Sequence, residues 1–532
     1  DVERSRGLGD VYKRQVLWRM VMIQLKSQIK KFGLIFVAML VGAFQSQAAK
    51  THLNMGMVLE PPHLDPTAGA AAAIDEVVYA NVFEGLTRIN RNGEVLPALA
   101  KSWEISGDGL KYTFHLQSGV KFHDGASFDA YDVVFSLERA MAEGSVNAQK
   151  ALFKPIAKVV ASGNQKVVIT LKNPTGHFLF NLGWGDAVMV DQGSSATNKS
   201  KPVGTGPFVF KRWVSGDRVE LGPNPNYWGE KPALKTATFK FIPDAAAAVA
   251  AIMAGDVDAF ANFPAPEMAG QFKNDSRFSV VEGSTEGETI LSTNNQKAPF
   301  NDLRVRRAIA HALNAQEIVD GAMFGYGTPI GTHFAPHHPA YVDLKGLYPH
   351  DPEKAKALLA EAGFPNGLKA TLKLPPPTYA RRGGEVIQAQ MAKVGIELEL
   401  IPVEWAQWLD QVFRNKDFDL TIVSHTEPMD IGIYTRPDYY FLYQNPGFNA
   451  IIETLNVTTN PKQRYALMGA AQAVIAQDAV NGYLFQLAKL GIWNSNLSGL
   501  WENSPVQAND LTAVSYTHLR AHETSLHLVC RL

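Results

Sequence analysis

The stretch PALAKSWEISGDGLKYTFHLQSGVKFHDGASFDAYDVVFSLER, residues Pro97 to Arg139, decides most of what this sequence says about its fold. Apolar residues alternate with polar ones, as in a half-buried strand, at Leu110, Tyr112, Phe114 and Leu116. The turn Gly107-Asp108-Gly109 precedes this strand and predicts a hairpin. Beyond Asp124-Gly125 the apolar spacing becomes helical, with Ser127 or Asp129 as the cap, at Ala130, Val133, Val134, Leu137 and Met141. Strand and helix each have one apolar face, so both must pack on a common core.

Both ends of the chain resemble translated sequencing adapter. One back-translation of Asp10 to Gln15 is GATGTGTATAAGAGACAG, and its reverse complement, read in a shifted frame, encodes VSYTH, the sequence of Val514 to His518. We therefore expect residues 1–15 and 514–532 to be adapter-derived. The single cysteine, Cys530, falls in the second segment.

Residues 20–48 have the layout of a secretory signal peptide. Lysines between residues 26 and 31 precede the apolar run 32–44, and Ser46-Gln47-Ala48 gives a small-x-small cleavage site. The run is shorter than the roughly 20 apolar residues that a membrane span needs. No cysteine follows it to carry a lipid anchor, so we expect a free protein in the periplasm of a Gram-negative cell.

Length and charge narrow the class of protein. A chain of 532 residues, 46% hydrophobic and 19% charged, is long enough for two or three domains of ordinary soluble composition. Residues 1–48 and 514–532 carry +6 between them, so residues 49–513 carry −7 where the whole chain carries −1. This acidic balance argues against nucleic acid or an anionic membrane as the partner.

The first two blocks of predicted structure span residues 50–202. The first has a strand at His52–Val58 and a helix around Asp75–Glu84, with the proline-rich loop 61–66 between them. The second contains the opening stretch and a further strand at Val167–Leu171. In the stretch that follows, Gly204 and Gly206 flank Thr205 and indicate a backbone conformation that only glycine tolerates, hence a sharp crossing point.

Helices and strands then alternate. One helix spans Asp244–Ala254, the next is capped by Asn301 or Asp302, and a third is capped by Asp351 and stops at Gly363. Later strands are predicted at Leu368–Leu374, Ile396–Ile401 and Phe418–Val423, separated by helices at 381–393 and 405–415. This order predicts a mostly parallel sheet with helices on its faces.

Eight segments, in this order, are similar to the family 5 extracytoplasmic solute-binding proteins, which serve peptide and nickel ABC importers. They are PPHLDP (61–66), VFEGL (82–86), the opening stretch, VGTGPF (203–208), NPNYW (224–228), GDVDAF (255–260), PFNDLRVRRAIAHAL (299–313) and DPEKAKALLAEAGFPNG (351–367). Each motif alone is weak evidence, whereas the ordered set covers nearly the whole chain.

The resemblance implies an α/β protein of the type II periplasmic binding fold. Two α/β lobes would be joined by crossing strands at a hinge, with an additional small domain on the N-terminal lobe. Lobe I would be discontinuous (49–90, 203–286 and 490–513), the additional domain would be 91–202, and lobe II would be 287–489. The resemblance further implies a carrier that acts as a monomer, closes over a peptide or peptide-like solute and delivers it to an ABC permease in the inner membrane.

Candidate ligand contacts lie in loops after strands. In relatives, the segment after the strand at 418–423 carries an acid that pairs with a ligand amine, which makes Glu427 and Asp430 the candidates here, or else a solvated loop. His425 stands where a tryptophan is common and is a structural donor or a ligand contact. Aromatic candidates, each with a core or surface role as the alternative, are Trp405, Trp408, Tyr439 and Tyr440.

In the first lobe, Glu60 follows a strand, and Tyr79 and Asn81 are expected on the next helix, where they would meet an extended ligand. Asp65 is expected to stabilise a turn before proline. His333, His337 and His338 raise the question of metal, but Pro336 and Pro339 favour a mobile loop, so we predict no metal site.

Signatures of catalysis are missing from the sequence, including HExxH, GxSxG, GxxxxGK[ST] and CxxC. We therefore expect no catalytic residue and no cofactor. Two alternatives stay open: a receptor for a nickel chelate or an opine, and a periplasmic hydrolase with a nucleophile and base across the cleft.

Overall fold

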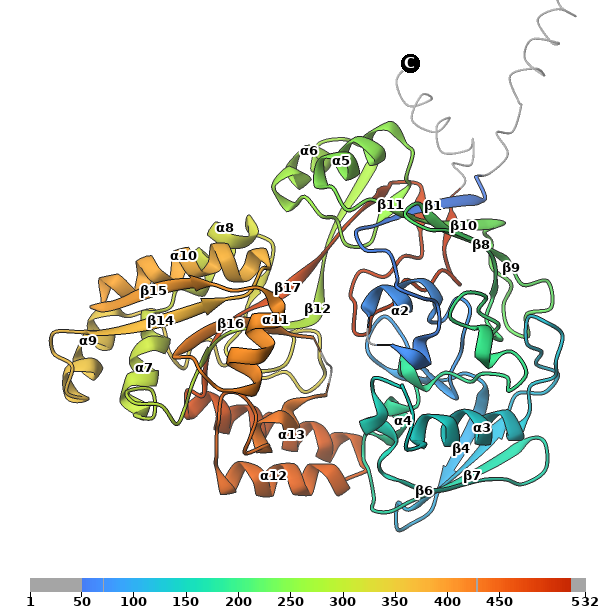
Figure 1. Ribbon diagram of the computed structural model, residues 1–532, viewed down its shortest axis with the longest axis horizontal. Coiled ribbons are helices and arrows are strands. Elements are labelled where there is room, and N and C mark those ends of the chain that lie inside the picture. The colour runs from blue at the N-terminus through green and yellow to red at the C-terminus, as the bar shows by residue number, and fades with distance from the viewer. Residues whose placement is uncertain (1–49, 70, 427–428, 518–532) are drawn as a thin grey trace, which may run out of the picture. The chain divides into compact units, whose positions relative to one another are not determined.

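The computed structural model describes residues 50–69, 71–426 and 429–517 (Figure 1). The chain divides into two units, residues 1–50 and residues 51–532, and the fold described here belongs to the second. The predicted signal peptide and most of both predicted adapter segments lie outside the described residues. Among the described residues, no helix combines the length and apolar character needed to cross a bilayer.

The opening stretch folds as its alternation predicts. Strands β4 (Ala100–Ile105) and β5 (Lys111–Leu116) form an antiparallel hairpin, and a four-stranded sheet in the order β4-β5-β7-β6 is completed by β6 (Ile156–Ala161) and β7 (Lys166–Leu171). Helix α3 (Ala130–Met141) follows, and its cap is Asp129, in a capping box with Asp132. The apolar side chains of strand and helix share one buried cluster, as predicted.

A larger eleven-stranded sheet runs through most of the remaining chain in the order β15-β14-β16-β12-β17-β11-β1-β10-β9-β8, with β13 paired to β17. Its strands are β1 (His52–Met57), β8 (Phe208–Val214), β9 (Arg218–Pro223), β10 (Thr236–Phe241), β11 (Ala259–Phe260), β12 (Phe278–Thr293), β13 (Thr328–Pro329), β14 (Leu368–Leu374), β15 (Ile396–Pro402), β16 (Leu420–His425) and β17 (Asn481–Asn494). Two short ladders complete the described strands, β2 (Thr87–Ile89) with β3 (Val95–Pro97) and β18 (Leu497–Ser498) with β19 (Ser515–Tyr516).

Strands β12 and β17 form the connection between the two halves of the large sheet (Figure 1). They are antiparallel, and Phe278 pairs with Asn494 at one end and Ser292 with Asn481 at the other. Their register shifts between Ser284 and Glu288, which leaves an irregular segment in the middle of the ladder. A two-strand link with a local irregularity is a suitable place for a hinge.

The parallel prediction holds for part of the sheet only. Strand β14 is parallel to β15 and β16, whereas β12 pairs antiparallel with both β16 and β17. In the described residues, further helices belong to the same parts of the chain as these two halves of the sheet. They are α2 (Ala72–Val78), α5 (Ala245–Ala254), α6 (Ala269–Lys273), α7 (Leu303–Ala312), α8 (Ala315–Met323), α9 (Pro352–Glu361), α10 (Thr378–Lys393), α12 (Pro446–Val457) and α13 (Pro461–Gln477). Asp302 and Asp351 cap α7 and α9, as the sequence indicates, and Asp244, expected as the first residue of its helix, is the cap of α5.

Two local predictions need correction. Helix α2 ends at Val78, so Tyr79 and Asn81 lie beyond it rather than on it. Gly204 and Gly206 do not have positive φ angles. They are required because the chain passes against another backbone segment: a Cβ on Gly204 would collide with the Val82 carbonyl, and one on Gly206 would lie 2.5 Å from the Asn81 carbonyl oxygen.

The buried apolar clusters support the proposed domain division, which remains a prediction. One cluster joins residues from 53–89 to residues from 208–261 and 493–514, as a discontinuous lobe I requires, and it also includes Phe180, Val188 and Val190 of the proposed additional domain. A second lies within 86–189, and two others draw on residues from 290 to 485. Val514 is buried in the first cluster, and β19 pairs with β18, so the first residues of the predicted adapter tail pack on the fold.

Candidate functional site

A cavity of about 620 Å³ lies between residues 149–184 and residues 408–440, which belong to the proposed additional domain and lobe II. On one side its walls come from the 3₁₀ turn Lys150–Phe153 and helix α4 (Phe178–Asn181) with Trp184 after it. On the other side they come from the end of α11 (Trp405–Trp408), the π-helical turn Leu409–Arg414, the end of β16 and the 3₁₀ turn Ile431–Thr435. The cavity is as large as small-solute sites commonly are.

Aromatic and apolar side chains make up much of the wall. Phe180 and Trp184 lie on one side, 6.0 Å apart between ring centroids, and Trp408 and Phe413 lie on the other, stacked at 6.2 Å. Trp408 is also fixed from behind, because its indole N–H donates to Thr421 Oγ1 over 2.9 Å. A wall held in this way gives an apolar solute group a preformed surface.

Asp430 brings a carboxylate to this cavity. Its Oδ1 lies 2.7 Å from Nε2 of His333, whose Nδ1 lies 2.5 Å from Oε1 of Glu288 on β12. The His333 and Glu288 side chains are each 2% exposed, and that of Asp430 is 15% exposed. Desolvation by itself would lower the pKa of His333. Attraction to Glu288 and Asp430 raises this pKa by more than desolvation lowers it, so the net shift is upward. The Asp430 carboxylate in the cavity is therefore paired with a buried, protonated His333.

His425 also lies in the cavity wall. It is buried, stacks with Tyr440 at 6.0 Å, and its Nε2 is 3.1 Å from the Tyr440 hydroxyl. Burial lowers its pKa to about 4, so the ring is neutral at pH 7. The structure thus gives His425 a structural partner in a position that also lines the cavity.

The other predicted residues are placed as follows. Tyr439 lines the cavity beside Arg436, whose guanidinium lies 5.7 Å from the tyrosine ring centroid. Trp405 is 41% exposed and contacts Trp408 edge-on at 5.6 Å, outside the cavity lining. Glu427 lies outside the described residues.

The two predicted contacts of lobe I have other partners. Glu60 accepts hydrogen bonds from the Trp213 indole N–H over 2.9 Å and from the Gly216 backbone N–H over 3.0 Å. Tyr79 is buried, and its hydroxyl donates to the Gly183 carbonyl over 2.6 Å. Neither residue lines the cavity described above. Asp65 has the predicted turn role, since its Oδ1 accepts from the Thr67 N–H over 3.0 Å.

Sequence reasoning missed Glu288 and the buried position of His333. The segment with His333, His337 and His338 forms no helix, as predicted, but His333 and His338 are 3% and 7% exposed. His337 pairs with Glu286 over 2.7 Å. One signal was available, a glutamate followed directly by the apolar core of a strand, in ETIL from residue 288. In the described part of the chain no cluster of three or more potential ligands is suited to a metal ion.

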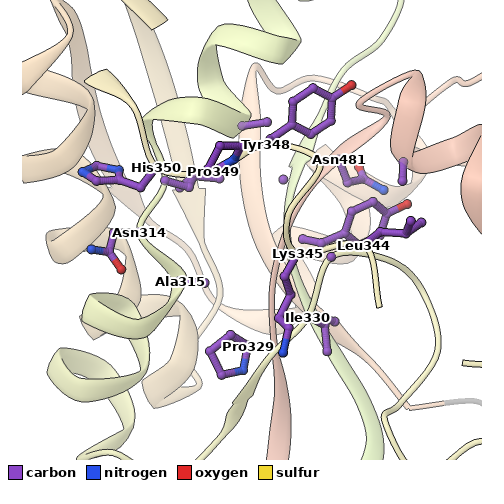
Figure 2. Close-up of a pocket in the computed structure, with 16 residues that line it drawn as sticks. Asn314, Ala315, Pro329, Ile330, Leu344, Lys345, Tyr348, Pro349, His350 and Asn481 are labelled. Atoms are coloured by element: carbon purple, nitrogen blue, oxygen red, sulfur yellow. The ribbon is translucent and has the colours of Figure 1, made fainter. Parts of the chain in front are cut away.

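A second, smaller cavity of about 200 Å³ lies within the proposed lobe II (Figure 2). Its lining includes Asn314, Pro329, Lys345, Tyr348 and Asn481, drawn from residues 310–350 and 476–483. The Lys345 ammonium lies 3.4 Å from Asp343. All its walls come from residues of the proposed lobe II.

The chain belongs to the bacterial extracellular solute-binding proteins, family 5, whose model matches residues 94–448. The heme-binding protein A of Haemophilus influenzae is 31% identical over 433 residues, which cover 73% of this chain and 78% of the relative. The dipeptide-binding protein of Escherichia coli is 31% identical over 449 residues, covering 78% and 82%.

Solved structures agree with this family and with the fold. HbpA2 from Haemophilus parasuis superposes with a TM-score of 0.79 at 26% identity, covering 88% of this chain and 100% of that one. The periplasmic binding protein DppA from Helicobacter pylori, in complex with the peptide STSA, gives a TM-score of 0.74 at 26% identity, covering 88% and 99%. The chain therefore has the two-lobed type II periplasmic binding fold, and its family is extracytoplasmic.

Proposed function

We propose that this protein is the periplasmic receptor of an ABC importer and that it captures a peptide or peptide-like solute in the cavity between residues 149–184 and 408–440. The solute leaves unchanged, and an inner-membrane permease receives it from the closed receptor. The transport energy comes from ATP hydrolysed by another subunit.

The observation that carries this proposal is the pairing of one carboxylate with aromatic walls in a cavity formed by two parts of the chain. Asp430 is placed to accept a charge-assisted hydrogen bond from a peptide amine, while Trp184, Trp408 and Phe413 offer surface to apolar side chains. Arg436 and Tyr439 lie in the same lining and offer a cation and a hydroxyl to other polar groups of the solute. The named functions of relatives that bind dipeptide or the peptide STSA support this class of solute.

Of the predicted site residues, Asp430, His425, Trp408 and Tyr439 are proposed as ligand contacts, with Trp405 as a second ring behind Trp408. Glu427 is kept as a proposed contact. Glu60 and Tyr79 are proposed to act through the loops that they hold in lobe I. We propose further that the receptor acts as a monomer after removal of a signal peptide at residues 20–48.

A thermal-shift screen of the purified chain tests the class of solute. A solute that binds only the folded form raises the melting temperature by mass action. We expect dialanine, trialanine or phenylalanyl-alanine to raise it, and opines and nickel–histidine complexes to leave it unchanged. The reverse pattern would establish the opine or nickel alternative, and turnover of any compound by the pure protein would establish a hydrolase.

Heme is a second candidate, favoured by the similarity to heme-binding protein A and by the apolar, aromatic cavity walls. Two histidines, His177 and His425, line the same cavity. Absorbance titration with hemin distinguishes this candidate, because peptide binding leaves the visible spectrum unchanged and heme binding does not.

A further inference from the structure

Behind Asp430 the structure holds a buried charged cluster that solute capture alone does not require. Its members are Glu286 and Glu288 on β12, His333 and His337 from the loop after β13, and Asp430 at the cavity. His333 is the cation that Glu288 and Asp430 share, at 2.5 Å and 2.7 Å, and His337 pairs with Glu286 at 2.7 Å. Three carboxyl groups therefore face two imidazoles.

This arrangement lacks one positive charge. With every member ionised, the cluster would keep a net negative charge next to an apolar interior, which is unfavourable. Burial accordingly raises the pKa of Glu288, which favours retention of its proton in the empty protein. The Glu288 carboxyl is buried with Nδ1 of His333 2.5 Å away, and desolvation outweighs the attraction of His333.

The other titratable groups packed around the pair do not supply the missing charge. Burial lowers the pKa of both His425 and His338, and burial raises the pKa of the neighbouring tyrosine hydroxyls, so all of these groups are neutral at pH 7. The tyrosines are Tyr434, Tyr440 and Tyr483. The open side of the cluster is the Asp430 carboxylate, which faces the cavity.

We propose that Glu288 and His333 are positioning residues for Asp430 that couple capture of a cationic solute group to release of one proton from Glu288. The solute cation supplies the missing positive charge at Asp430, so the Glu288 carboxyl loses its proton to solvent while His333 stays charged between the two carboxylates. The O–H bond of the Glu288 carboxyl breaks, a water molecule or buffer base takes up the proton, and no covalent bond of the solute forms or breaks. The inference rests on the proposed function and adds a preference for cationic solutes that strengthens as pH rises.

Calorimetric titration in two buffers of different ionisation enthalpy measures the released protons directly. The probes are dialanine, trialanine and phenylalanyl-alanine at pH 6.5, where a peptide amine is already protonated. We expect wild type to release up to about one proton per bound peptide, and its affinity to rise up to about tenfold per pH unit between pH 5.5 and 7. Glu288→Gln should release none and lose this pH dependence.

Glu282→Gln is the matched control, since Glu282 lies on the same strand, is 48% exposed and pairs with Lys273 outside the cluster. It should release protons like wild type. If Glu288→Gln does not fold, N-acetyl-alanyl-alanine on wild type replaces it, because this probe lacks the cation and should cause no release.

Peptide binding without proton release by wild type would overturn the inference and leave the proposed function intact. Equal release by Glu288→Gln, or by wild type with the acetylated probe, would also overturn it. A protein that binds none of the peptides would contradict the proposed function itself, and the coupling with it.

Discussion

In the proposed function, solute recognition depends most on Asp430. We expect Asp430→Asn to weaken binding of a peptide with a free amine by about tenfold to a hundredfold, since a charge-assisted hydrogen bond contributes about 1.5–3 kcal/mol. Calorimetry measures the change. Asp438→Asn, at an exposed position outside the cavity lining, is the control and should bind like wild type. Equal loss in both variants would mean that the effect is general electrostatics and not a contact.

His338 gives a prediction about pH and stability. Its ring stacks on Phe334 at 4.3 Å, its Nδ1 accepts from the Ala340 N–H over 3.0 Å, and burial lowers its pKa to about 3. In the unfolded chain His338 takes up a proton near pH 6.5, whereas in the folded chain it stays neutral at that pH. His338 therefore lowers the stability of the folded chain as pH falls below 6.5. By pH 5 the cost is about 2 kcal/mol.

The test compares wild type with His338→Gln. At pH 7.5 the variant should melt lower, because it loses the ring stacking, and this difference in melting temperature should shrink as pH falls to 5. Calorimetric melting at both pH values measures it, with His52→Gln at an exposed position as the control. A difference that stays constant with pH would show that His338 takes up its proton in the folded state.

The roles of residues that depend on nearby sequence could be predicted, whereas contacts between residues far apart in sequence could not. The candidate acid Asp430 followed from the family resemblance, which implies an acid in the segment after the strand at 418–423. Its partner His333 lies 97 residues away in sequence, and no periodicity or turn signal connects the two. Glu60 was expected to be available to a ligand in a loop, whereas its carboxylate accepts a hydrogen bond from Trp213, 153 residues further on.

At the scale of elements, helix α3 tests the interpretation that Asp129 caps the helix in the stretch from Pro97 to Arg139. Asp129 Oδ1 accepts from the Tyr131 N–H over 2.8 Å, and Asp132 accepts from the Asp129 N–H over 2.8 Å. Asp129→Ala should destabilise the protein by about 1 kcal/mol, as loss of a cap does. Thermal melting measures this, and Glu138→Ala, exposed on the same helix, should change the melting temperature far less.

The crossing segment at Gly204 and Gly206 gives a second element-scale prediction. Because a Cβ on Gly204 would collide with the Val82 carbonyl, Gly204→Ala should destabilise the fold by about 2 kcal/mol or more. Gly107→Ala is the control, since nothing lies within 4 Å of a Cβ at Gly107. Soluble yield and melting temperature report both variants, and a Gly204→Ala protein as stable as the control would contradict the close approach.

Elements with strong local signals were predicted well, and their long-range relations less so. Alternation and caps located β5, β14, α3, α5, α7 and α9 to within a few residues. The glycines around Thr205 were identified correctly, but the reason is the neighbouring backbone and not their own φ angles. The antiparallel pairing of β12 with β16 and β17 could not be predicted, because strand order depends on contacts across up to about half of the chain.

For the whole molecule, the two-lobed fold, the cavity and the crossing strands together agree with the proposed receptor that closes on its solute. The register shift between Ser284 and Glu288 lies in the only stretch of described ladder that joins the two halves of the large sheet. Glu288 belongs both to this stretch and to the charged cluster behind Asp430. One strand, β12, thus carries both the proposed hinge and a member of the charged cluster.

Small-angle X-ray scattering of the purified chain, with and without a saturating peptide from the screen, tests this account most directly. A receptor that closes about β12 and β17 should show a smaller radius of gyration when peptide is bound, because lobe closure makes the molecule more compact. An unchanged radius with peptide demonstrably bound would contradict closure around the solute.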